Sequence, residues 1–147
     1  KCADRLIKTA PMRTAAHAPL RCRFTDKASA SSDRLELSSL FVCVLSVPRG
    51  AAAFDGAFLE GHKVLSWAGN NMSKYGSGEH VAAVDVWTLI STPQYGKANK
   101  CSQEFMPENM RRKVSEEMRA AFAAVLGCEA SSCESWEVLH LQLWGAA

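Results

Sequence analysis

The sequence has no apolar run long enough to cross a membrane. A spanning helix needs about 20 consecutive apolar residues, and the richest stretch, residues 41–48, ends at Arg49. With 48% apolar and 22% charged residues over 147 positions, the composition is that of one ordinary globular domain. We therefore expect no membrane partner.

The short motifs of common catalytic sites are also missing. The chain has no Gly-Lys-Ser/Thr loop, no Gly-x-Ser-x-Gly turn and no His-Glu-x-x-His pair. Residues 76–81 (GSGEHV) begin like a dinucleotide-binding turn, but a third glycine is lacking and a strand pattern follows instead of a helix. The residues alone therefore indicate an incomplete catalyst.

Cysteine and histidine are too scattered for a metal site. Cys128 and Cys133 are five positions apart, without the second Cys/His pair that zinc needs, and the four histidines stand alone. Six cysteines without a secretory context predict free thiols rather than disulfides. We expect no bound metal and favour an intracellular, reducing compartment.

Residues 1–40 form a basic segment rich in Ala and Ser, with eight Lys/Arg against four acids. An organelle-targeting segment is one interpretation, but the acids and the absence of an initiator Met argue against it. Nucleic-acid binding is disfavoured because the basic residues are scattered and only Phe24 could stack on a base. The chain starts at Lys1 and ends on apolar residues, so we expect an internal piece of a longer chain.

From residue 41 the pattern predicts an α+β fold, in which a mixed, mostly antiparallel sheet carries one long amphipathic helix on a face. Residues 41–47 are continuously apolar and are stopped by Pro48, which is typical of a central strand buried on both faces. The other expected elements are a hairpin of residues 57–59 with 64–67, a loop over 70–80, a strand over 84–92, a helix over 107–126 and a strand over 136–144.

The last strand, residues 136–144, alternates with period two, so it has two distinct faces. Leu139, Leu141 and Leu143 make one apolar face. The opposite face carries Trp136, Val138, His140, Gln142 and Trp144. Two indoles around an imidazole and an amide are typical of a ligand-pocket wall. A hydrogen-bonded histidine at a domain contact is the other interpretation.

Three segments resemble the second half of renalase-like FAD-dependent amine oxidases. They are residues 55–59 (DGAFL), 65–76 (LSWAGNNMSKYG) and 86–95 (VWTLISTPQY). Residues 120–127 (AAFAAVLG) and His140 are similar to that family's later helix and final strand. The order and spacing agree from about residue 41 to the end.

This resemblance implies that residues 41–147 are a partial substrate-binding domain of a two-domain flavoprotein, while residues 1–40 stay poorly assigned. The complete protein would bind a small-molecule substrate, pass hydride from a reduced nicotinamide-type or amine compound to FAD, and reoxidise the flavin with oxygen. FAD would be held by the flavin-binding part of the same polypeptide. The family's Gly-x-Gly-x-x-Gly and Gly-Asp motifs are missing here, so we expect no FAD binding by this chain alone.

The residues expected to border the substrate are Trp67, Asn71, Ser73, Lys74, His140 and Trp144. The pattern departs from the family at Met72, Tyr75, Ile90 and the pair at 141–142, so an altered pocket is expected. Two alternatives remain: a non-catalytic binding or interaction domain derived from the same fold, and an α+β domain of unrelated origin.

Overall fold

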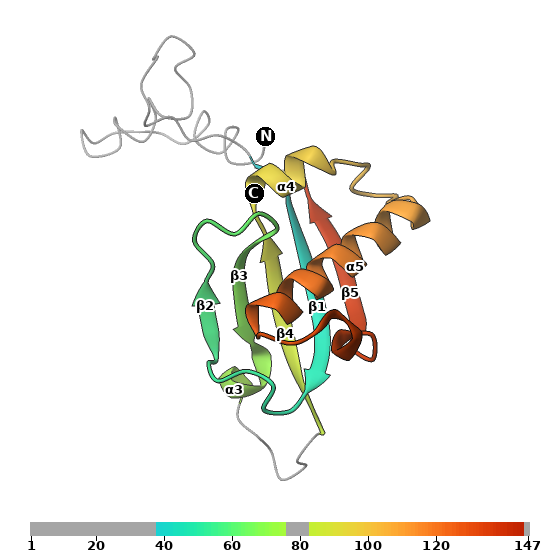
Figure 1. The fold of residues 1–147 in the computed structure, drawn as a ribbon. Coiled ribbons are helices and arrows are strands. Elements are labelled where there is room, and N and C mark those ends of the chain that lie inside the picture. The colour runs from blue at the N-terminus through green and yellow to red at the C-terminus, as the bar shows by residue number, and fades with distance from the viewer. Residues whose placement is uncertain (1–37, 76–82, 146–147) are drawn as a thin grey trace, which may run out of the picture. The chain divides into compact units, whose positions relative to one another are not determined.

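A five-stranded antiparallel sheet is the centre of the fold in the computed structural model, which describes residues 38–75 and 83–145 (Figure 1). The strand order is β2-β3-β4-β1-β5, and every pairing between neighbours is antiparallel. The strands are β1 (Leu40–Pro48), β2 (Gly56–Phe58), β3 (Leu65–Asn70), β4 (Val84–Ser91) and β5 (Glu137–Trp144). The helices are α3 (Asn71–Tyr75), α4 (Pro93–Ala98) and α5 (Glu108–Val125), with a 3₁₀ turn at Ala130–Cys133. The predicted α+β class is confirmed. Most of the basic segment predicted over residues 1–40 lies outside the described residues.

Strand β1 is central, as predicted, because it pairs with β4 on one side and β5 on the other. Its side chains alternate between full and partial burial. Phe41, Cys43, Leu45 and Val47 are fully buried, whereas Val42 and the other alternate residues are half-buried. Burial on both faces was predicted, but within the described residues only one face of β1 is fully covered.

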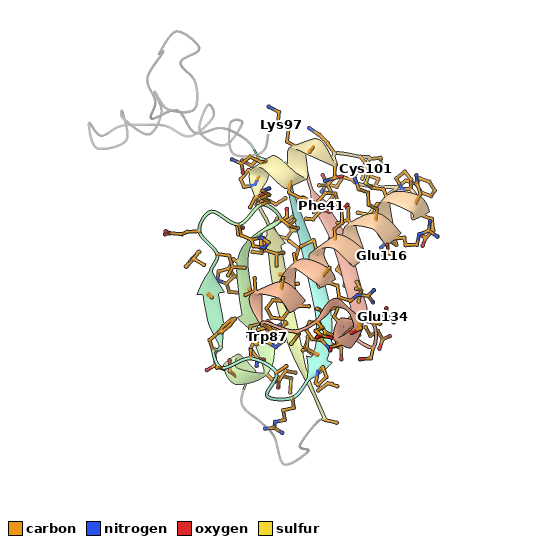
Figure 2. All side chains as sticks on the ribbon, viewed as in Figure 1. Phe41, Trp87, Lys97, Cys101, Glu116 and Glu134 are labelled. Carbon is orange, nitrogen blue, oxygen red and sulfur yellow. The ribbon has the colours of Figure 1, made fainter. Side chains whose placement is uncertain are left out.

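Helix α5 lies across one face of the sheet and supplies the other half of the core (Figure 1). Val114, Met118 and Phe122 are fully buried along one stripe, which confirms the predicted packing. The Phe122 ring lies 5.0 Å from the Trp87 ring, centroid to centroid. Figure 2 shows Trp87 on the sheet beneath α5, while the exposed Glu116 lies on the helix. Gly127, with φ of 71°, ends the helix as predicted.

A β-bulge in the β1–β5 ladder changes the predicted alternation of the last strand. Val44 pairs with His140 while the next residue, Leu45, pairs with Val138, so Leu139 is an extra residue. From His140 to Trp144 the side chains alternate between the two faces as predicted. From Trp136 to Val138 each side chain lies on the face opposite to the predicted one. Trp136, predicted on the polar face, is instead buried against Phe122, and Leu139, predicted in the apolar face, is exposed.

Two short helices were not predicted. Residues 70–80 were expected to be a loop, but α3 forms at Asn71–Tyr75, where Asn70 Oδ1 accepts from the Met72 N–H (2.9 Å). The rest of that predicted loop, residues 76–80, lies outside the described residues. Helix α4 begins after Thr92, whose hydroxyl accepts from the Tyr95 N–H (3.2 Å), with Pro93 in the first turn. Thr92 therefore caps a helix and does not continue β4. In the described ranges, no helix has both the length and the apolar character needed to span a bilayer.

Candidate functional site

The candidate site is the sheet face turned away from α5, called here the open face. Residues directly paired across strands share a face, and Trp87 and Leu89 point toward α5, so their neighbours in sequence point away. In the described part of the chain no helix crosses this face. The open face comprises Leu40, Val42, Val44, Ser46, Pro48, Gly56, Phe58, Trp67, Gly69, Val84, Val86, Thr88, Ile90, Glu137, His140, Gln142 and Trp144.

The open face has an apolar centre with aromatic groups at its two sides. Val42 pairs with Ile90, and Val44 pairs with Thr88, so β-branched side chains fill the middle. Phe58 on the β2 edge is 81% exposed and Trp144 on the β5 edge is 52% exposed. Phe58 and Trp144 therefore add exposed apolar surface at the two edges of this face.

Trp67 lies along the open face because its neighbour Gly69 has no side chain. A Cβ placed at Gly69 would come within 2.1 Å of the Trp67 indole atom Cη2. The six-membered ring of the indole therefore occupies the space above Gly69. This glycine therefore leaves the space that the Trp67 indole occupies on the face.

Asn71 extends the open face at the end of β3, where α3 begins. Its Nδ2 donates to Thr88 Oγ1 (2.9 Å), and the Thr88 hydroxyl lies 3.3 Å from Asn71 Oδ1. The two side chains hold each other in place, which leaves an amide and a hydroxyl at a fixed position beside the apolar centre. Thr88 was not predicted as a site residue.

His140 and Gln142 provide the polar groups of the opposite side, on β5. His140 Nε2 lies 3.4 Å from Gln142 Oε1, and both side chains are exposed. Thr88, Val44 and His140 form one row across three strands. The Thr88 Cα is therefore about 10 Å from the His140 Cα, which is two strand spacings.

Four of the six predicted site residues lie on or beside the open face: Trp67, Asn71, His140 and Trp144. Ser73 is placed differently, since it is exposed on α3 and its hydroxyl donates to the Asn70 carbonyl (3.0 Å). Lys74 belongs to α3, but its side chain lies outside the described part of the structure. The predicted set is therefore brought together only in part.

The groups with strongly shifted pKa values lie on the α5 side and not on the open face. Burial raises the pKa of the Cys43 thiol to about 12, and the Arg119 guanidinium opposes this to a smaller extent. Burial also raises the pKa of Tyr95, and its hydrogen bond to Glu117 acts in the same direction. Both groups stay protonated at neutral pH, so neither is an activated nucleophile.

Sequence reasoning also missed a hollow on the α5 side, beside His62. The only signal was a His-Lys pair in the turn of the predicted hairpin, which is usually a solvated turn.

No protein-family model matches the chain, and a search of curated proteins finds no relative.

Proposed function

We propose that this chain is the substrate-binding half of a flavin-dependent oxidoreductase resembling renalase. The open face would form the roof of a pocket completed by the flavin-binding part of the same polypeptide. The substrate would be a small reduced nicotinamide-type or amine compound. The observation that carries this proposal is an apolar sheet face, bordered by aromatic and polar groups, over which no described helix packs.

The apolar sequence of β1 indicates that another part of the protein or a ligand covers the open face. A strand that is apolar at nearly every position is typical of sheets covered on both sides, yet only the α5 side of β1 is fully buried in the described residues. A flat ring system placed against Val42, Val44 and Ile90 would bury this surface. At about 25 cal/mol per Å² of apolar area, such burial is a substantial part of ligand affinity.

The described residues fit a role over the flavin and do not fit a role in holding it. Within residues 38–75 and 83–145 no glycine-rich turn leads from a strand into a helix N-terminus, the arrangement that receives a pyrophosphate. FAD, when bound by the rest of the polypeptide, supplies hydride acceptance and reoxidation by oxygen. This chain's residues would orient the substrate and exclude water from it.

Individual roles follow from the geometry. The Asn71 amide, held by Thr88, would bind a polar substituent at one side of a ring, and His140 would bind one at the other. Trp67, on β3, would lie on the Asn71 side of the ring, and Val44 of β1 would lie between the two polar groups. A hydride transfer needs orientation more than acid–base catalysis, which agrees with a face that carries no paired carboxylates.

The test uses the native full-length protein. We expect it to purify with the visible absorption of bound flavin and to consume oxygen with a reduced nicotinamide dinucleotide or a primary amine as probe. Asn71→Ala and His140→Ala should each lower kcat/KM about tenfold, or ~1.4 kcal/mol, at unchanged flavin content. Glu116→Ala, an exposed change on α5, is the control. Wild-type kcat/KM in both open-face variants would place the pocket elsewhere.

The second candidate is a non-catalytic interaction domain, which the high exposure of Phe58 and Trp144 favours. A colourless full-length protein with no oxygen consumption would refute the flavoprotein proposal and support this one.

A further inference from the structure

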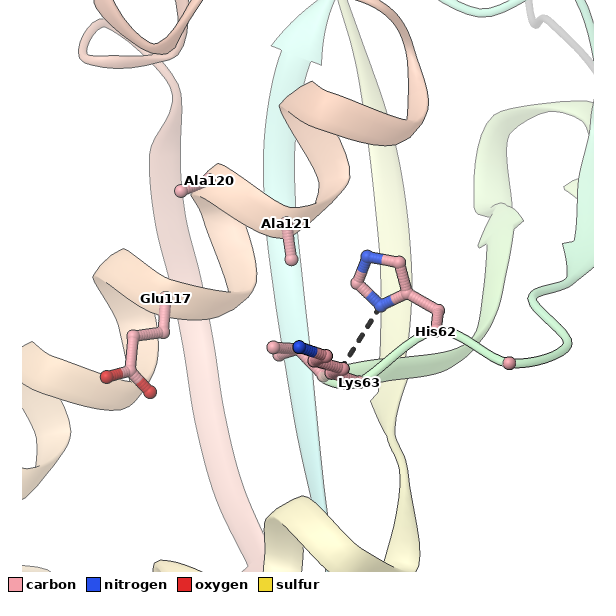
Figure 3. A pocket seen from close by; sticks show the side chains of 7 residues that line it. His62, Lys63, Glu117, Ala120 and Ala121 are labelled. Carbon is pink, nitrogen blue, oxygen red and sulfur yellow. Dashed lines mark hydrogen bonds between the residues drawn. The ribbon is translucent and has the colours of Figure 1, made fainter.

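A hollow of about 540 Å³ lies on the α5 side of the sheet, between the turn that joins β2 to β3 and the helix. The turn residues 61–64 line one wall, and Glu117, Ala120 and Ala121 of α5 line the other. Figure 3 shows His62 and Lys63 on the turn facing these helix residues. The volume is in the range of small-ligand pockets, and the hollow lies on the opposite side of the sheet from the open face.

His62 is locked in one tautomer by the turn itself. Its Nδ1 accepts from the backbone N–H groups of Val64 (3.2 Å) and Leu65 (3.0 Å). A ring nitrogen that accepts hydrogen bonds carries no proton, so in the neutral ring the proton is on Nε2. Nε2 has no hydrogen-bond partner within the described ranges, and in Figure 3 it is turned away from the backbone. His62 therefore offers an uncommitted Nε2–H donor to the hollow.

The turn is also held to Thr92, the residue between β4 and α4. The Thr92 N–H donates to the Val64 carbonyl (2.8 Å), and the Thr92 hydroxyl donates to the Lys63 carbonyl (3.0 Å). These are the carbonyls of the two peptide groups whose N–H groups bind His62 Nδ1. Because both peptide groups are held, the direction of the His62 Nε2–H is fixed as well.

The carboxylate that lines the hollow, Glu117, contacts two groups outside it. One Glu117 oxygen accepts from the Tyr95 hydroxyl, and the other lies 3.9 Å from Lys113 Nζ. The Lys63 ammonium makes no ion pair with the described residues. The uncommitted polar groups of the hollow are therefore two donors, His62 Nε2–H and Lys63 Nζ, beside an apolar wall formed by Val64, Ala120 and Ala121.

We infer that this hollow binds a small carboxylate with a short apolar tail. The carboxylate oxygens would accept from His62 Nε2–H and from Lys63 Nζ, which are charge-assisted contacts of the stronger kind. The tail would lie against Ala120 and Ala121. This site is independent of the proposed flavin-dependent function, because it uses no open-face residue and needs no FAD.

The test is an NMR titration of the full 147-residue chain with sodium 4-methylpentanoate. We expect saturable shifts at the amides of residues 61–65 and 120–121 and at the His62 ring nitrogens, with a Kd of about 1 mM. The uncharged analogue 4-methylpentan-1-ol should bind at least about tenfold more weakly, because it lacks the charge that the two donors recognise.

Three variants separate the contributions. His62→Asn keeps an oxygen acceptor for the two backbone N–H groups but removes the Nε2–H, and Lys63→Met keeps the chain length but removes the charge. Each should weaken carboxylate binding about tenfold. Ala120→Leu fills the hollow from an exposed helix position with a good helix former, so it should abolish binding in a folded protein. Glu116→Ala, on the same helix outside the hollow, is the control and should bind as wild type.

Several results would overturn the inference. They are the absence of saturable shifts up to about 10 mM, equal binding of acid and alcohol, and wild-type binding by folded Ala120→Leu.

Discussion

Phe122→Ala is the most direct test of how this fold is held together. Phe122 is fully buried on α5 and contacts the two buried indoles, with centroid distances of 5.0 Å to Trp87 and 6.2 Å to Trp136. Truncating a buried Phe to Ala costs about 3–5 kcal/mol through lost transfer energy and the cavity left behind. A domain of this size has a free energy of unfolding of about 5–15 kcal/mol. The substitution should therefore remove a large part of the stability.

The assay is urea unfolding followed by tryptophan fluorescence and far-UV circular dichroism. With an m-value of about 2 kcal/mol per M, the midpoint should fall by about 2 M. Phe105→Ala is the matched control, because that phenylalanine is 79% exposed and the same atoms are removed. Its midpoint should stay within about 0.3 M of wild type, since surface changes cost little. Equal midpoints for Phe122→Ala and wild type would mean that α5 does not pack on the sheet through this stripe.

Two further predictions concern other parts of the core. Gly96→Ala should lower the free energy of unfolding by about 1–3 kcal/mol, since its Cβ would lie 1.8 Å from the Ser39 carbonyl oxygen. Gly56→Ala is the control, because the nearest atom to its Cβ would be 3.6 Å away. Equal urea midpoints for the two variants would contradict the close approach at Gly96. The free energy of unfolding should also fall above pH 9.0, because the unfolded chain then loses the Cys43 proton while the folded chain keeps it up to about pH 12. Between pH 9.0 and about pH 12, urea titrations should show that wild type loses about 1.4 kcal/mol more unfolding free energy per pH unit than Cys43→Ala does. Parallel pH profiles of the two proteins would refute this prediction.

The elements best predicted from the sequence are those whose pattern depends on local spacing. The three-and-four spacing of α5 and the stop at Gly127 are readable because helical contacts are near in sequence. Strand β1 was identified by its continuous apolar residues and by Pro48 at its end. Which face of β1 would be covered was not readable, because that depends on the position of a helix that begins 60 residues after the strand ends.

The candidate site was predictable as a face but not as a set of contacts. Period-two alternation placed His140 and Trp144 together, and the structure keeps them together. The Asn71–Thr88 pair and the position of Trp67 over Gly69 involve two strands, or a missing side chain, so no single-strand pattern indicates them. The bulge at Leu139 was hidden for the same reason, since an extra residue is visible only against its partner strand.

The bulge at Leu139 is a place where β5 can lose a residue without disturbing its pairing with β1. Because Leu45 pairs with Val138 and Val44 with His140, the ladder would stay in register if Leu139 were absent. A homologous strand one residue shorter could thus keep the same side chains on each face, with its alignment gap at this position. The loss of a residue anywhere later in β5 would instead exchange buried and exposed positions along the rest of the strand. Leu139 is therefore the point at which the length of this strand can vary without loss of the open face.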